Sequence, residues 1–210
     1  MTLAGGVKMA NLHPLLVVLL SYLVGSIPFG VILGSRLGGL DVRKHGSGNI
    51  GATNVLRTLG LGFAVCTFLL DTAKGAFALW LARSSGLGPA WIAAAGAAVV
   101  VGHNWPVWLA FRGGKGIATT FGFLLFAMPS VGIVVAVVWV AVIVAFRYAS
   151  VASMVAIACS PIAAFLAGYP REYTLVCLLF ALSAVIRHIS NIRRLVSGTE
   201  NKFVLKLRQL

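Results

Sequence analysis

Two polar segments of the sequence combine glycines, amides, hydroxyls and cations in a pattern that is typical of anion binding. Residues 45–57 contain three glycines and four hydroxyl or amide side chains, and they end in Arg57. Residues 102–116 place Arg112 and Lys115 on either side of a glycine pair, directly before an apolar run. Glycine lets backbone N–H groups approach a ligand closely, and guanidinium and ammonium groups bind phosphate. The two segments therefore predict a site for a phosphorylated substrate.

A third segment, residues 187–203, is rich in cations and also holds Glu200, one of only four acidic residues. Its simplest interpretation is an amphipathic basic tail that lies on anionic lipid. Glu200 favours a second interpretation, in which its carboxylate orients a cation from another loop. The 45–57 segment likewise has a simpler interpretation, as a flexible polar loop, and its composition leaves both open.

The sequence lacks the residue patterns of several common catalytic sites. The 102–116 segment is not a nucleotide-binding loop, because Gly116 follows Lys115 where that motif needs Ser or Thr. No histidine is followed five positions later by Asp, and there is no G-x-S-x-G motif. His103 is expected to hydrogen bond at a helix end, and the three cysteines form no C-x-x-C pair. We therefore expect no metal, no cofactor and little acid–base catalysis by the protein.

The composition predicts that helices in a lipid bilayer carry these segments. Of the 210 residues, 60% are hydrophobic and 10% are charged, whereas about 25% are charged in a typical soluble domain. About 20 apolar residues span a bilayer as a helix. We expect an all-α integral membrane protein with one polytopic domain, in which residues 1–11 are an extension and 204–210 a basic tail. The seven candidate spans are residues 12–33, 61–81, 89–109, 117–128, 131–146, 151–167 and 174–186.

The charge distribution predicts the orientation of these spans. The chain has 17 Lys and Arg against 4 Asp and Glu, a net charge of +13. With seven spans, thirteen cations fall on one side of the membrane, three on the other, and Lys74 within a span. The positive-inside rule then places the N-terminus outside and the C-terminus in the cytoplasm, and it explains the charge without nucleic acid. Residues 117–128 are short for a span, and the orientation depends on them.

Two charged residues lie within the second predicted span. Asp71 and Lys74 are three positions apart, and such charges are costly in lipid unless they pair or face a cavity. We expect a structural pair. A membrane transporter of a phosphorylated solute is an alternative function, because it also needs cations beside membrane cavities. That alternative predicts functional cations near the bilayer midplane, whereas here they cluster toward one face.

Together, the polar segments resemble one family, the PlsY acyl-phosphate:glycerol-3-phosphate acyltransferases of bacterial membranes. The agreement extends from Gly25 to Phe203 in the same order, which makes chance agreement implausible. The matching positions are residues 47–57, 71–75, 102–103, Pro106, 111–116, 147–150, Arg187, His188, Asn191, Arg194 and 198–200.

The resemblance implies a multi-pass enzyme of the bacterial cytoplasmic (inner) membrane that catalyses the first step of phospholipid synthesis. An acyl group passes from acyl phosphate to the 1-hydroxyl of glycerol 3-phosphate, giving lysophosphatidate and inorganic phosphate. Acyl phosphate is already activated, so the protein acts mainly by positioning two anions, without a protein nucleophile or an obligatory base. The expected partners are the two substrates, membrane lipid and the enzyme that produces the acyl phosphate.

The same resemblance assigns roles to residues of the polar segments. Gly113, Gly114 and Gly116 permit close approach of the substrate, and Glu200 orients the cations, with Arg187 and Arg194 in support. The residues expected to bind substrate are Ser47, Asn49, Arg57, Lys115, Ser150, His188 and Asn191.

Overall fold

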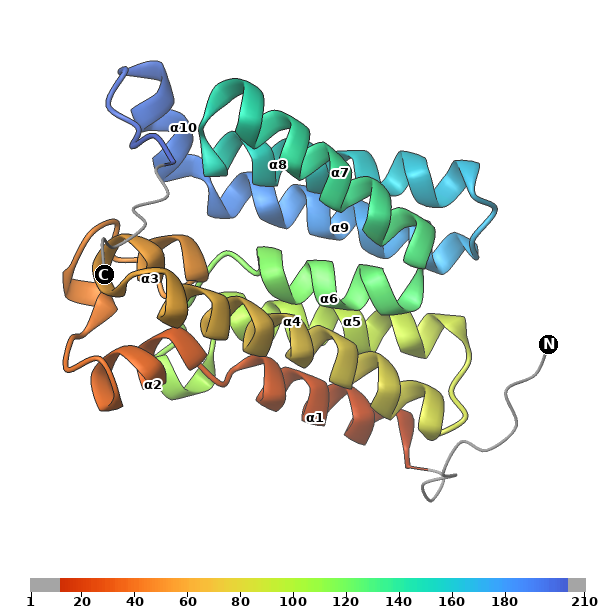
Figure 1. The fold of residues 1–210 in the computed structure, drawn as a ribbon. Coiled ribbons are helices and arrows are strands. Elements are labelled where there is room, and N and C mark those ends of the chain that lie inside the picture. The colour runs from red at the N-terminus through yellow and green to blue at the C-terminus, as the bar shows by residue number, and fades with distance from the viewer. Residues whose placement is uncertain (1–11, 204–210) are drawn as a thin grey trace.

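A computed structural model describes residues 12–203, which form α-helices and short 3-10 turns without any β-strand (Figure 1). The expected extension at 1–11 and tail at 204–210 lie outside the described residues. The helices are α1 (Pro14–Gly25), α2 (Phe29–Arg36), η1 (Val42–Lys44), α3 (Ala52–Leu59), α4 (Leu61–Ser84), α5 (Pro89–Asn104), η2 (Val107–Leu109), α6 (Ile117–Ala127), α7 (Pro129–Phe146), α8 (Ala149–Leu166), α9 (Arg171–Arg187) and α10 (Ile189–Val196).

Each of the seven predicted spans coincides with helical structure. α9 and α10 qualify as a membrane span only together, as a pair bent by 54°. The expectation of an all-helical, multi-span membrane protein is confirmed for the described residues, with five or six spans by length and composition. The five single segments that are long and apolar enough are Pro14–Arg36, Leu61–Ser84, Pro89–Leu109, Pro129–Phe146 and Ala149–Leu166.

The short segment α6 forms a hairpin with α7. α6 has 11 residues, and one residue, Met128, separates its end at Ala127 from the start of α7 at Pro129. Gly132 of α7 packs directly on the backbone of Leu125 in α6, so the chain reverses direction between the two helices. A single crossing by residues 117–146 would have placed the segment after α9 at the opposite end. The reversal instead returns that segment to the end of the bundle where α2 and α3 lie (Figure 1).

Close approach of small residues holds the centre of the bundle together. A Cβ on Gly75 of α4 would collide with the backbone oxygen of Thr119 in α6. A Cβ on Gly122 of α6 would in turn collide with the backbone of Thr72 in α4. Such contacts let helices pack by van der Waals attraction where lipid offers no hydrophobic drive between them. The α4–α6 pair therefore forms a rigid wall beside the polar loops.

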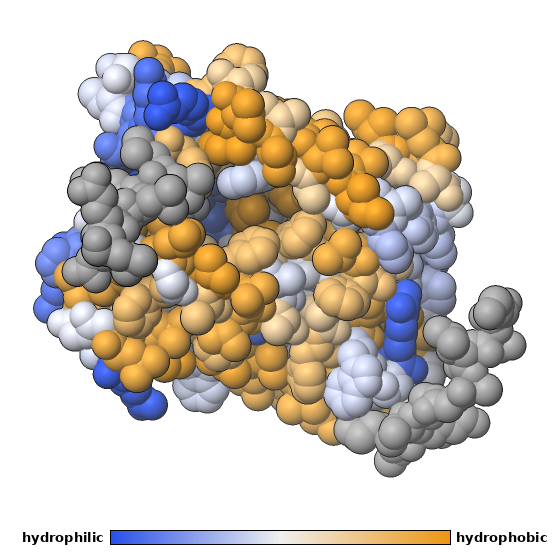
Figure 2. All heavy atoms as spheres, in the orientation of Figure 1, coloured by the Kyte–Doolittle hydropathy of each residue, from blue (hydrophilic) through white to orange (hydrophobic). Residues whose placement is uncertain are grey.

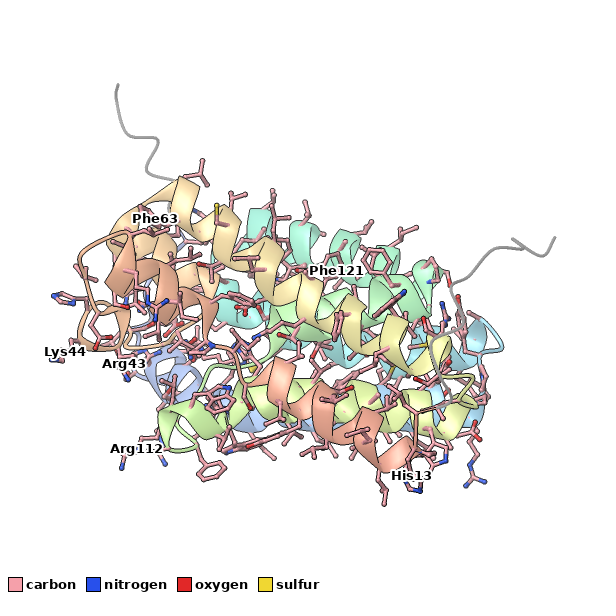
Figure 3. The ribbon with its side chains drawn as sticks, turned by 90° about the horizontal axis from the view of Figure 1, so that it is seen from below. His13, Arg43, Lys44, Phe63, Arg112 and Phe121 are labelled. Atoms are coloured by element: carbon pink, nitrogen blue, oxygen red, sulfur yellow. The ribbon has the colours of Figure 1, made fainter. Side chains whose placement is uncertain are left out.

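The outer surface of the bundle is suited to lipid. Large apolar side chains such as Val144, Phe165 and Leu182 are exposed by 74%, 73% and 61%. Figure 2 shows hydrophobic residues over most of the visible flank, with the hydrophilic ones gathered mainly toward the two ends. Figure 3 places Arg43, Lys44 and Arg112 at the end of the bundle opposite His13. The arrangement is that of a protein that spans a bilayer.

The two charges inside α4, Asp71 and Lys74, form the expected structural pair, and His103 of α5 also contacts them. Lys74 Nζ lies 2.8 Å from Asp71 Oδ1, and all three side chains are at most 4% exposed. The same ammonium donates hydrogen bonds to Gly25 O and Ile27 O, both at 3.1 Å. These carbonyls lie at the break between α1 and α2, where the helical hydrogen bonds are interrupted. The buried lysine therefore stabilises the break as well as the charge pair.

Candidate active site

A polar pocket at one end of the bundle collects residues from all three polar segments. All seven residues predicted to bind substrate lie on its wall, together with Gly116 and Glu200. Gly113, Gly114, Arg187 and Arg194 do not line it and lie behind the wall. The pocket-lining residues with predicted roles are Ser47, Asn49, Arg57, Lys115, Gly116, Ser150, His188, Asn191 and Glu200.

A hydrogen-bonded network centred on Glu200 connects several side chains along one side of this pocket. Ser150 donates to Glu200 Oε1 at 2.8 Å, and Asn191 donates to the same oxygen at 2.6 Å. Arg194 pairs with Oε2 at 2.7 Å. Lys115 Nζ donates to Asn191 Oδ1, so the lysine connects to the carboxylate through the amide. The network aligns a hydroxyl, an amide and an ammonium group along the pocket wall.

The glycine pair before Lys115 is held in place from two directions. The N–H groups of Gly113 and Gly114 donate to the backbone oxygens of Asn104 and His103. Arg187 donates to the oxygens of Gly113 and Gly114 at 2.8 and 2.9 Å. A Cβ on either glycine would collide with the end of α5. Arg187 thus positions the loop that carries Lys115, which is consistent with the supporting role expected for it.

Asn54 organises the glycine-rich loop before α3 and was not among the predicted site residues. Its Nδ2 group is within hydrogen-bonding distance of Val42 O, His45 O and Asn49 O, at 2.8, 3.2 and 2.8 Å. Its Oδ1 accepts from Ser47 N at 2.8 Å. The side chain is 1% exposed. Residues 45–51 therefore form a tightly hydrogen-bonded loop before α3, and the signal available in the sequence was only an asparagine in a run of small polar residues.

The charges at the pocket shift the pKa values of its groups. Burial, together with Arg194, Arg57 and Arg187, lowers the pKa of Lys115 to about 8, although Glu200 opposes the shift. Burial tends to raise the pKa of Glu200, but hydrogen bonds from Asn191, Arg194 and Ser150 outweigh it and lower that pKa. Arg57, Lys115, Arg187 and Arg194 lie near Glu200, and Asp71 is already paired with Lys74, so the pocket has excess positive charge. An anionic ligand would relieve this repulsion.

Other residues of the pocket were predicted only in part or not at all. Asp71 and His103 were expected to have structural roles, yet both also line the pocket. Thr53, Ser153 and Trp139 also lie on the wall. Thr53 and Ser153 lie inside helices, where sequence alone does not tell a pocket-facing hydroxyl from one bonded to its own helix.

An apolar groove adjoins the polar pocket and opens on the flank of the bundle. Leu56, Val65 and Phe121 line one side, and Val135, Val140 and Ile157 line the other. Figure 2 shows a hollow on this face, between α7 and the α3–α4 region of Figure 1. The pocket and the groove share the residues Ala52, Thr53, Phe68, Ile117, Trp139 and Ser153.

The comparison with known proteins agrees with this geometry. The model of the glycerol-3-phosphate acyltransferase family matches residues 15–198. The chain belongs to this family. It is 50% identical over 186 residues to a glycerol-3-phosphate acyltransferase of Gloeobacter violaceus, covering 87% of this chain and 91% of that one. A relative from Desulforudis audaxviator is 46% identical over 195 residues, covering 93% and 98% of the two chains.

Two solved structures of the family share the fold. They are crystal structures of PlsY, an integral membrane glycerol 3-phosphate acyltransferase, in a glycerol 3-phosphate form and a lysophosphatidic acid form. The TM-scores are 0.86 and 0.85, at 38% identity over 91% of this chain and 96% of those chains. The predicted family and the multi-pass membrane fold are therefore confirmed.

Replacement of Asn54 by alanine should weaken anion binding. The change removes the buried hydrogen bonds that hold Ser47 and Asn49 in place, each contributing about 0.5–1.5 kcal/mol. We expect the affinity for sulfate, a stable phosphate mimic, to fall by roughly tenfold or more in calorimetry on purified protein. Thr58→Ala is the matched control on α3, because its hydroxyl bonds only to oxygens of its own helix. Equal affinities for the two variants would contradict the role of Asn54.

The binding of sulfate should also weaken above about pH 8. Lys115 is charged below its pKa of about 8 and loses its proton as the pH rises through that value. Sulfate keeps its charge over this range, so the loss of affinity between pH 7 and 9, roughly tenfold, would report the lysine. Lys115→Arg should flatten the profile, since a guanidinium stays charged. An unchanged profile in this variant would assign the titration to another group.

Proposed function

We propose that the chain transfers a fatty acyl group from acyl phosphate to the 1-hydroxyl of glycerol 3-phosphate, giving lysophosphatidate and inorganic phosphate. The observation that carries this proposal is the continuity of a cation-lined pocket with an apolar groove. The pocket suits two phosphate groups, and the groove suits a fatty chain that enters from the bilayer. The crystal structures of PlsY in a glycerol 3-phosphate form and a lysophosphatidic acid form support the acceptor and the product.

The reaction needs positioning more than it needs a catalytic side chain. The 1-hydroxyl oxygen attacks the carbonyl carbon of the acyl phosphate, the bond from that carbon to the phosphate oxygen breaks, and inorganic phosphate leaves. The phosphate of glycerol 3-phosphate takes the hydroxyl proton in this substrate-assisted scheme. Lys115, Arg57 and the amide and hydroxyl groups around Glu200 hold the two anions and stabilise the developing charge.

The identity of the donor is tested by a direct assay of the purified protein. Inorganic phosphate release from palmitoyl phosphate should depend on glycerol 3-phosphate, and palmitoyl-CoA should not support product formation. Arg57→Ala should lose at least 100-fold in kcat/KM, because it removes a cation from the phosphate-binding wall. Folded protein that is silent with both donors would overturn the proposal and favour a transporter. Turnover with palmitoyl-CoA alone would retain an acyltransferase but exclude acyl phosphate.

We infer that the protein spans the inner membrane of a bacterial cell and that its pocket opens on the cytoplasmic side. The basic residues gather at the pocket end of the bundle, whereas Arg83 and Arg171 lie at the far ends of their spans, as the positive-inside rule requires. The pocket would then open toward the enzyme that produces the acyl phosphate.

The orientation is tested by labelling in intact cells. In a version lacking the three native cysteines, Lys8→Cys should react with a membrane-impermeant maleimide in intact cells. Lys206→Cys should react only after the cells are lysed, because the C-terminus is cytoplasmic in this orientation. The opposite pattern would invert the topology and exclude a cytoplasmic site.

A further inference from the structure

The segment that follows α10 connects the polar pocket to the apolar groove. Residues 200–203, here called the strap, have no helical structure. Glu200 at the start of the strap lines the pocket, and Phe203 at its end lines the groove. The carboxylate of Glu200 organises the phosphate-binding side chains, whereas the ring of Phe203 has no part in phosphate binding. The strap therefore carries one large aromatic side chain from the polar wall to the apolar wall.

Hydrogen bonds fix the strap to two sides of the pocket. Arg57 of α3 donates to the backbone oxygen of Asn201, with Nη2 at 3.4 Å. The N–H of Phe203 donates at 2.6 Å to the backbone oxygen of Arg147, which lies in the turn between α7 and α8. Glu200 is held by Ser150 and by two groups of α10. Because α3, α8 and α10 all contribute, the strap has a defined path and places Phe203 at one position on the groove wall.

The ring of Phe203 packs where the pocket and the groove join. It lies edge to face with Trp139, with 6.2 Å between the ring centroids and 88° between the planes. Trp139 lines both the pocket and the groove, and its indole N–H donates to Ser153 at 3.2 Å. Phe203 also packs against the buried residues Ile143 and Ala149. The ring is only partly buried, so these contacts leave part of it open to the groove that it lines.

The neighbours of Phe203 show which end of the groove it occupies. Ala149 begins α8 and comes directly before Ser150, a residue of the pocket wall. Ile157 also lines the groove, but it lies about 12 Å further along the same helix, at about 1.5 Å per residue. Since Phe203 packs against Ala149, it lies at the polar end of the groove. The carbonyl of an acyl phosphate bound at the polar wall falls at this same end.

An aromatic pair at this place suits the first methylene groups of an acyl chain, because rings bury much apolar surface in a fixed geometry. We propose that Phe203 binds the carbonyl end of the acyl chain and so positions the acyl donor where the pocket and the groove join. The strap links this contact to Glu200, so the group that contacts the chain and the group that organises the phosphate-binding side chains belong to one short segment. This contact rests on the proposed transfer from acyl phosphate.

Kinetics with a long and a short donor, palmitoyl phosphate and butyryl phosphate, test the role of Phe203 in the purified full-length protein. Phe203→Ala should raise the KM for both donors by about tenfold, because both contain the carbon atoms next to the carbonyl. The KM for glycerol 3-phosphate should change by less than about twofold, since the ring does not contact the acceptor. Phe203→Leu, which keeps part of the apolar contact, should raise the KM of the donors by only about threefold.

Two matched variants separate this contact from other effects. Lys202→Ala changes the neighbouring residue on the strap, which is exposed and lines neither the pocket nor the groove, and it should leave all three KM values unchanged. Phe121→Ala removes an aromatic ring from a deeper part of the groove, one turn beyond Ile117 on α6. It should raise the KM for palmitoyl phosphate far more than that for butyryl phosphate, whose chain is too short to reach this ring.

A purely structural role of Phe203 predicts a different result. Loss of its packing would displace Glu200 and raise the KM for glycerol 3-phosphate together with those for both donors, and this outcome would overturn the proposal. Unchanged donor KM values in Phe203→Ala, or an increase for palmitoyl phosphate alone, would also contradict it, while the proposed acyl transfer would stand. If the alanine variant does not fold, Phe203→Leu decides by the same comparison. A wild type that uses neither donor would remove the reaction and the contact together.

Discussion

The fold depends on one constraint: backbone groups that leave a helix within a membrane protein must find partners inside the protein. Helices line much of the pocket, and a single side chain braces each of three irregular segments at or near it. Lys74 bonds the carbonyls at the α1–α2 break, Asn54 bonds those of the loop before α3, and Arg187 bonds those of the glycine pair. These three side chains give hydrogen-bond partners to backbone groups that lack a helical partner, which allows an irregular polar site to form next to lipid.

This constraint explains why the sequence revealed the spans more readily than the site. Apolar runs must match the thickness of the bilayer, so their lengths predict helices directly. Even the doubtful run at 117–128 formed the short helix α6, and close packing of Gly132 on Leu125 produces its reversal. The composition of the polar segments predicted which chain regions meet. These segments lie at the same end of the bundle only because α6 and α7 form a hairpin, and a hydropathy pattern alone does not specify that hairpin.

The braces and the apolar groove were harder to predict for a physical reason. Asn54 looked like one of several small polar residues in its loop, and its importance comes from bonding four backbone groups at once. Lys74 and His103 lie 29 positions apart, so their contact arises only from the packing of α4 on α5. Groove residues such as Val135 and Phe121 have the same apolar character as lipid-facing ones. No property of the individual residue distinguishes the two environments.

The shared wall between pocket and groove suits the proposed reaction, in which one substrate comes from the lipid and the other from water. An acyl chain can stay in an apolar environment while its phosphate end reaches the cations, because the groove opens on the flank and the pocket lies at the bundle's end. Glu200 fixes the positions of Ser150, Asn191 and Arg194. It does not neutralise the site, because more cations than this one carboxylate can balance lie close to it. In the proposed reaction, phosphates bound there would leave the acyl carbonyl beside Phe68 and Trp139. The boundary between the polar and the apolar wall would then set the position of the reacting carbon.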